Sequence, residues 1–138
     1  MKTNFEIVDN YAVVFDNRLI DIHNNFDFQG FDYVVENRQL VLTWKKSNGD
    51  WVNYDELKQL TFSHNNVSYL TIIQNELSGD VLDDSCLSEI TFCPPQERYD
   101  NNSFFDRKNP DIDDDILYCF QNGQIIRVCA EEVQLTVE

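Results

Sequence analysis

Alternation of apolar and polar residues is the feature that most constrains the fold of this chain. In the segment RLIDIHNNFDF, residues 18–28, the apolar side chains at positions 20, 22, 26 and 28 are predicted to share one face, and the polar ones at 21, 23, 25 and 27 the other. A period of two residues indicates a β-strand with one buried face, because successive side chains point to opposite sides. Similar short segments follow along the chain: QLVLTWK, LTFSH, VSYLTII, SEITF, ILYCF, QIIRV and VQLTV.

Turn-forming residues separate these segments. Asp9-Asn10, Asn37-Arg38, Asn48-Gly49 and Asn122-Gly123 each lie at or between the ends of apolar runs. Asn-Gly is the strongest short hairpin signal, because a tight hairpin turn needs positive φ at both central residues. If residues 122 and 123 form a two-residue loop, Cys119 lies opposite Ile126 and points away from Cys129, so these two thiols are not expected to form a disulfide.

The pattern predicts an all-β fold with little helix, either an antiparallel sandwich or a curled open sheet of about nine short strands. The 138 residues fit one domain, and no linker divides them. Asp80 is a candidate cap for a short helix over residues 81–88. The segment from Pro94 to Asp115 is a long polar loop, which we expect the pair Phe104-Phe105 to hold against the body of the protein.

The net charge of −15 restricts the class of partner. Residues 80–138 carry 14 acids against four bases, so this part is the more acidic. Nucleic acids and anionic membranes are disfavoured, because binding to phosphate requires clustered Lys and Arg. A cationic protein partner is compatible with the charge, and so is acidity that only maintains solubility.

The segment MKTNFEIVDN has acids at Glu6 and Asp9 and no apolar core, and no run of about 18 apolar residues occurs elsewhere. We therefore expect a cytoplasmic protein whose four cysteines are reduced thiols. The cysteine spacings contain no C-x2-C pair, so neither zinc nor another cofactor is expected.

A dense run of aspartates, Asp111, Asp113, Asp114 and Asp115, precedes the ILYCF segment. Positions 111, 113 and 115 have the spacing of an EF-hand loop, but Ile116 and Asn122 stand where that loop requires Gly and Glu. A different calcium site that also uses Asp83 and Asp84 is left open, as is a solvated loop. The hypothesis that we develop is a recognition loop held out to a cationic partner.

No catalytic signature accompanies His23 or His64, and both are interpreted as ordinary polar positions. An enzyme is the least expected class, because no nucleophile, base and oxyanion-binding group can be identified together. Trp51, Tyr54 and Tyr99 lie in or beside predicted loops, where such side chains either anchor an interface or border the core.

The order RLIDIHNNFDF, QLVLTW, ELKQLTFSHNNVSYLTI and LSEITF resembles the small acidic β-rich immunity proteins of bacterial polymorphic toxin systems. The likeness covers residues 18–93 and consists of strand patterning, so it transfers no site residue. The resemblance implies a non-enzymatic protein that binds a cognate toxin and blocks it.

We therefore expect a protein-binding module that inhibits a cationic partner by covering its active surface, and the resemblance implies that this partner is a toxin domain. The contact residues would be Asp111, Asp113, Asp114 and Asp115 first, and Asp83 and Asp84 second. The alternatives are a structural scaffold domain and a β-sandwich that binds calcium or a small ligand. An exposed edge strand would also allow a homodimer.

Overall fold

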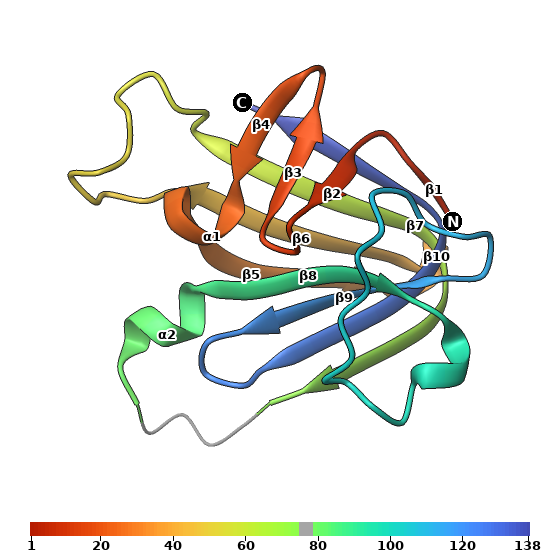
Figure 1. The fold of residues 1–138 in the computed structure, drawn as a ribbon. Helices are drawn as coiled ribbons and strands as arrows, with labels where there is room; N and C mark the ends of the chain where they lie inside the picture. The colour runs from red at the N-terminus through yellow and green to blue at the C-terminus, as the bar shows by residue number, and fades with distance from the viewer. Residues whose placement is uncertain (75–78) are drawn as a thin grey trace.

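Two antiparallel sheets dominate the computed structural model, which describes residues 1–74 and 79–138 (Figure 1). The larger sheet has the strand order β5-β6-β7-β10-β9-β8, with the short β1 pairing in parallel with β10. Its strands are β1 Lys2–Thr3, β5 Phe26–Val34, β6 Gln39–Lys46, β7 Gln59–Ile73, β8 Leu87–Cys93, β9 Asp115–Phe120 and β10 Ile125–Val137. The smaller sheet contains β2 Glu6–Val8, β3 Ala12–Phe15 and β4 Arg18–Asp21. The described residues thus form ten strands, and the expectation of an all-β fold with a curled open sheet is confirmed.

Helical structure among the described residues is limited to single turns. These are α1 Ile22–Asn25, α2 Val81–Ser85, and the 3₁₀ turns η1 Val35–Asn37 and η2 Pro95–Glu97. The predicted cap is confirmed, because the Asp80 side chain accepts a hydrogen bond from the backbone N–H of Leu82. None of the helices in the described part of the chain is long and apolar enough to cross a membrane.

Two long strands, β7 and β10, allow the sheet to curl. They pair from Leu60 with Val137 to Ile73 with Ile125, and their register shifts between Cys129 and Ala130. Such a bulge bends a strand and increases its twist, so one strand can take part in both halves of a curled sheet. The expectation that LTFSH and VSYLTII, and likewise QIIRV and VQLTV, are separate strands is therefore wrong.

The segment of residues 18–28 is not one continuous strand. The Asp21 carboxylate accepts hydrogen bonds from the backbone N–H and the side-chain amide of Asn24, which stabilises the turn α1 between β4 and β5. Ile20, Ile22 and Phe26 are nevertheless buried, as the alternation predicts. The turn redirects the chain from the small sheet to the edge of the large one.

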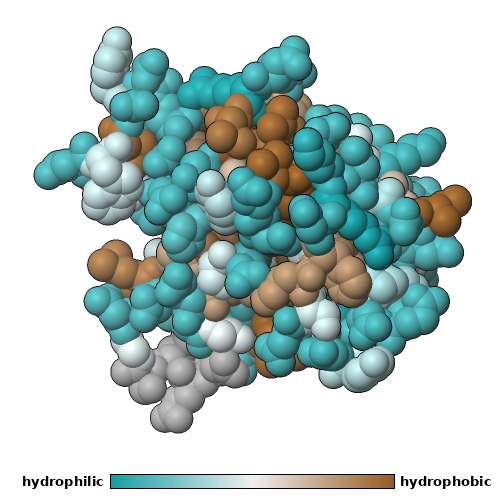
Figure 2. All heavy atoms as spheres, viewed as in Figure 1, coloured by the Kyte–Doolittle hydropathy of each residue, from teal (hydrophilic) through white to brown (hydrophobic). Residues whose placement is uncertain are grey.

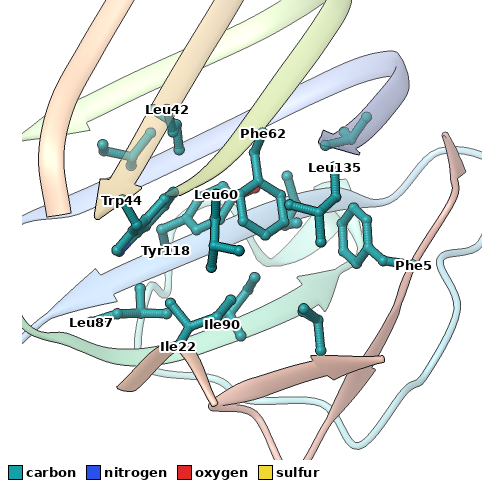
Figure 3. Packing of buried hydrophobic residues seen from close by; sticks show 14 of the residues in the cluster. Phe5, Ile22, Leu42, Trp44, Leu60, Phe62, Leu87, Ile90, Tyr118 and Leu135 are labelled. Carbon is teal, nitrogen blue, oxygen red and sulfur yellow. The ribbon is translucent and has the colours of Figure 1, made fainter. Parts of the chain in front are cut away.

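The core lies between the concave side of the large sheet and the small sheet (Figure 3). Phe5 from the N-terminal segment packs edge-on against Phe62 of β7, and Trp44 of β6 contacts Phe62 and Tyr118. The turn between β2 and β3 is the predicted one, since Asp9 and Asn10 have φ of 51° and 59°.

His64 is part of this core, so its interpretation as an ordinary polar position is wrong. It is fully buried, with Nδ1 3.0 Å from the carbonyl oxygen of Leu40 and Nε2 2.9 Å from the Tyr118 hydroxyl. A carbonyl only accepts, so Nδ1 donates and Nε2 accepts the Tyr118 proton. Burial lowers the pKa of His64 from 6.5 to about 4, and the ring is neutral at pH 7.

The hairpin between β9 and β10 has a loop of three residues, one more than predicted. Phe120 donates to the carbonyl of Gln124, and Gly123 has φ of 87° and donates to the carbonyl of Phe120. Cys119 consequently pairs with Ile125 instead of Ile126. In this register Cys119 and Cys129 lie on the same face of the sheet, so the expectation that they point away from each other is wrong. They are four positions apart along the strand direction, which is too far for a disulfide, and all four cysteines are free.

Candidate protein-binding surface

The aspartate run is divided between the interior and the surface. Asp114 and Asp115 are 2% and 0% exposed, whereas Asp111 and Asp113 are exposed. The expectation that all four carboxylates are held out to solvent is therefore wrong for Asp114 and Asp115. The reason is that Arg98, Arg107 and Arg127 neutralise the two buried charges.

Asp115, the first residue of β9, is held by two arginines. Its Oδ2 accepts from Nε of Arg127 at 2.6 Å and from Nε of Arg98 at 2.9 Å, and its Oδ1 accepts from Nη2 of Arg98 at 2.8 Å. Arg127 is itself almost fully buried in β10. A carboxylate without solvent is stable only when it is paired and hydrogen-bonded, which this arrangement satisfies.

Arg127 also binds the start of the 94–115 loop. Its Nη2 donates to the carbonyl of Pro94 at 3.0 Å, and its Nη1 donates to the carbonyl of Glu97 at 3.0 Å. Arg98 stacks over the Tyr69 ring of β7, with its Cζ 3.7 Å from the ring centroid. One ionic cluster therefore connects the beginning of the loop, its end and the convex side of the sheet.

A second ion pair shapes the tip of the loop. Arg107 Nη1 donates to Oδ2 of Asp114 at 2.6 Å and to Oδ2 of Asp111 at 2.8 Å. The Asp114 carboxylate also accepts from the backbone N–H of Asp111 at 2.9 Å. Asp114 thus closes a turn over residues 111–114 from the inside, while the side chains of residues 111–113 face solvent.

The middle of the loop is attached to both sheets. Phe105 donates through its backbone N–H to Thr91 Oγ1 of β8, and its carbonyl accepts from the Asn10 side chain. The Phe105 ring packs against Cys93, Leu117 and Cys119, which confirms its expected anchoring, whereas Phe104 is exposed. The backbone N–H of Ile7 donates to the carbonyl of Lys108 at 2.9 Å, so the loop also joins the small sheet to the large one.

We use the name loop tip for residues 111–113, Asp111, Ile112 and Asp113, all of which are exposed. Ile112 and Asp113 line an open groove of about 1330 Å³ beside the bulge of β7 and β10. Glu36, Glu131 and Glu132 also line it, together with Lys2 and Arg38. Carboxylates therefore outnumber cationic side chains around this groove, and an exposed apolar residue stands at its rim.

Asp83 and Asp84 lie in α2, away from the loop tip. The Asn122 side chain donates to the Asp84 carboxylate at 3.0 Å, and the Asn122 backbone N–H donates to the carbonyl of Asp83. Asn122 belongs to the β9–β10 turn, whereas the aspartate run enters β9 at the other end of this six-residue strand (Figure 1). The structure does not bring the two acidic groups together into one site.

Within residues 1–74 and 79–138, no three His, Cys, Asp or Glu side chains gather in a way that would hold a metal ion. The nearest approach to a thiol–imidazole pair is Cys86 Sγ, 3.7 Å from Nδ1 of His23. That nitrogen is only 2.6 Å from the carbonyl oxygen of Leu87, so it must donate there and cannot take the thiol proton. Burial, with Asp27 and Asp83 nearby, raises the pKa of Cys86, which keeps the thiol protonated.

The three aromatic residues expected either to anchor an interface or to border the core are all exposed: Trp51, Tyr54 and Tyr99. Trp51 is nonetheless held in place, because its Nε1 donates to the carbonyl of Asn24 at 2.7 Å. The face in view in Figure 2 is mostly hydrophilic, with apolar residues in small separate patches. This face thus offers no extended apolar surface, and recognition there would depend on charge and on a few apolar contacts.

Sequence reasoning missed the three arginines that organise the loop. A signal was present for Arg127, which stands within the apolar run QIIRV of a predicted strand. If this arginine is buried it requires a carboxylate as partner, and the aspartate run is the nearest candidate in the sequence. Nothing comparable indicated Arg98 or Arg107, which lie in a polar segment.

Comparison with protein-family models, with curated proteins and with solved structures finds no match to this chain.

Proposed function

We propose that this chain is a non-enzymatic protein-binding module that recognises a cationic protein through the loop tip. The observation that carries the proposal is the anchoring of the loop. The ion pairs of Asp115 with Arg98 and Arg127, and of Asp114 with Arg107, hold the loop from the inside while Asp111 and Asp113 stay exposed. A loop that only spans two strands would not need these five charged side chains at its base.

Preorganisation favours binding. A loop already held in one conformation loses little conformational entropy when a partner docks, so more of the contact free energy appears as affinity. The net charge of −15 adds long-range attraction toward a basic surface, which accelerates encounter at low ionic strength. Asp113 has no ion-pair partner among the described residues, so its charge is available to a partner.

The resemblance to immunity proteins supports a toxin domain as the partner. A toxin that acts on nucleic acid carries a basic cleft, and an acidic loop with an exposed apolar residue beside it is complementary to such a cleft. The module would then inhibit by covering that cleft in the cytoplasm of the producing cell. Catalysis by the module itself is not required for this role.

The test begins with the neighbouring gene, which the proposal expects to encode a protein with a basic C-terminal domain, and that domain is the probe. We expect a stable complex, measured by isothermal titration calorimetry, and rescue of cells that express that domain. If the neighbouring gene encodes no such domain, or the domain does not bind, the toxin proposal fails.

Stopped-flow association rates then test the loop tip. The variant Asp111→Asn with Asp113→Asn should associate about tenfold more slowly at low salt, and the difference should vanish as salt screens the field. The matched control is Asp9→Asn with Asp16→Asn, which removes the same charge from two exposed turns whose positive φ suits asparagine. Equal rates for the two double variants would show that the loop tip has no special role.

A further inference from the structure

Strand β5 forms a free edge of the large sheet. Among the described residues it pairs only with β6, at the end of the order β5-β6-β7-β10-β9-β8. Every residue from Phe31 to Arg38 is exposed. An edge of this kind presents unpaired backbone groups to which another strand can add.

The direction of those backbone groups follows from the pairing of β6. Lys46 donates to the carbonyl of Lys58, so the even-numbered residues of β6 bond to the β7 side and the odd-numbered ones to the β5 side. The bond from Ser47 to the carbonyl of Asn25 fits this alternation. Phe31 and Tyr33 lie opposite Leu42 and Leu40, whose backbone groups turn away from β5. Opposite residues in an antiparallel pair turn the same way relative to each other, so the N–H and C=O groups of Phe31 and Tyr33 turn away from β6 and point to the free edge.

The side chains of Phe31 and Tyr33 are partly exposed on the core side of the sheet. Residues directly opposite in a pair share a face, and Leu42 and Leu40 are completely buried. Phe31 and Tyr33 are 36% and 39% exposed, because no further strand covers them. A strand added along β5 would hydrogen-bond to their backbone and place apolar side chains beside their rings.

Charge selects the kind of strand. The segment from Phe26 to Glu36 contains the acids Asp27, Asp32 and Glu36 and no Lys or Arg. A second copy of this chain would bring three more carboxylates to the same edge, which is unfavourable. A strand that alternates apolar residues with Lys or Arg would instead place its cations near these acids. Glu36, in the turn η1 that follows β5, also lines the groove beside the loop tip, so the groove begins where the edge strand ends.

We propose that the free edge of β5 accepts an extended strand of the cationic partner, with apolar residues on the core side and basic residues on the other. This inference rests on the proposed binding of a cationic protein, but it places a second contact on main-chain hydrogen bonds instead of on the loop tip. Affinity would come from the shared backbone pairing and selectivity from the alternating side chains.

The probe is a short acetylated peptide of alternating lysine and valine. It is titrated into the ¹⁵N-labelled protein, and the backbone amide signals are followed by ¹⁵N–¹H NMR. The expected result is a shift of the amide signals of Phe31 and Tyr33 and slower hydrogen exchange at both. A matched peptide with glutamate in place of lysine should leave these signals unchanged. The inference is overturned if neither peptide shifts these signals at saturating concentration, or if both shift them equally.

A pair of variants at one position separates backbone pairing from side-chain contact. Tyr33→Pro removes the outward N–H, whereas Tyr33→Thr keeps it and suits a strand. Peptide binding should be about tenfold weaker for the proline variant than for the threonine variant, which corresponds to one or two main-chain hydrogen bonds. Equal binding by the two variants, with circular dichroism showing both folded, would contradict the inference.

The outcomes distinguish this inference from the proposed function. If the lysine peptide shifts only signals of the loop tip, the edge inference fails and the binding of cationic proteins stands. Protection of Phe31 and Tyr33 that grows with protein concentration in the absence of peptide would show a second copy at the edge, and would also overturn the inference. If the partner's basic domain binds Tyr33→Thr and Tyr33→Pro equally while the loop-tip variant is slowed, only the loop tip is used.

Discussion

Replacement of Asp115 by Asn tests whether the aspartate run is divided as the structure indicates. The change keeps the size and shape of the side chain and removes one buried charge. Arg127 is 1% exposed and would lose its only carboxylate partner among the described residues, while its other contacts are with neutral oxygens. The free energy of unfolding should therefore fall by about 3–5 kcal/mol, the usual cost of leaving one member of a buried ion pair alone.

Asp113→Asn is the matched control. It removes the same charge two positions away, from an exposed side chain with no ion pair among the described residues. Its effect on the free energy of unfolding should stay within about 0.5 kcal/mol. Any general relief of repulsion in a chain of net charge −15 is the same for both variants, so it cancels in the comparison.

Urea unfolding followed by circular dichroism measures the difference. With a slope of about 2 kcal/mol per molar urea, the midpoint of Asp115→Asn should lie about 2 M below that of Asp113→Asn. Equal midpoints would refute the reasoning, because they would mean that Asp115 is solvated or that Arg127 finds a second anion. The result also bears on the binding proposal, since a loop without its anchor would not be preorganised.

Two further predictions concern the core and the hairpin. Burial lowers the pKa of His64 from 6.5 to about 4, so as pH falls below 6.5 the unfolded chain takes up a proton at this histidine before the folded protein does. The free energy of unfolding should therefore be highest above pH 6.5 and should fall by about 2 kcal/mol by about pH 5. Urea unfolding at pH 7 and about pH 5 should show this loss in the wild type and not in His64→Gln, and parallel pH dependences would contradict it. Gly123→Ala should lower the free energy of unfolding by about 1–2 kcal/mol in thermal unfolding, because φ of 87° strains any residue with a Cβ; an unchanged midpoint would show that the turn relaxes.

Local patterns in the sequence were sufficient for the class of fold and for much of the core. The two-residue period identified Leu40, Leu42 and Trp44 as one buried face, because side-chain direction in a strand depends only on position along it. The Asp9-Asn10 turn was equally predictable, since its φ values depend on the residues in the turn itself. The short helix after Asp80 followed from a capping residue for the same reason.

Only the tertiary structure decided where strands continue and which charges are buried. LTFSH and VSYLTII read as two strands in the sequence, yet β7 runs through both, because one extra residue of β7 between Val67 and Tyr69 is absorbed as a bulge and the pairing with β10 continues. Asp113 and Asp115 are the same residue type two positions apart, and one is exposed while the other is enclosed by Arg98 and Arg127. The environment of a charge depends on groups that the fold brings from distant segments, and a local pattern carries no information about them.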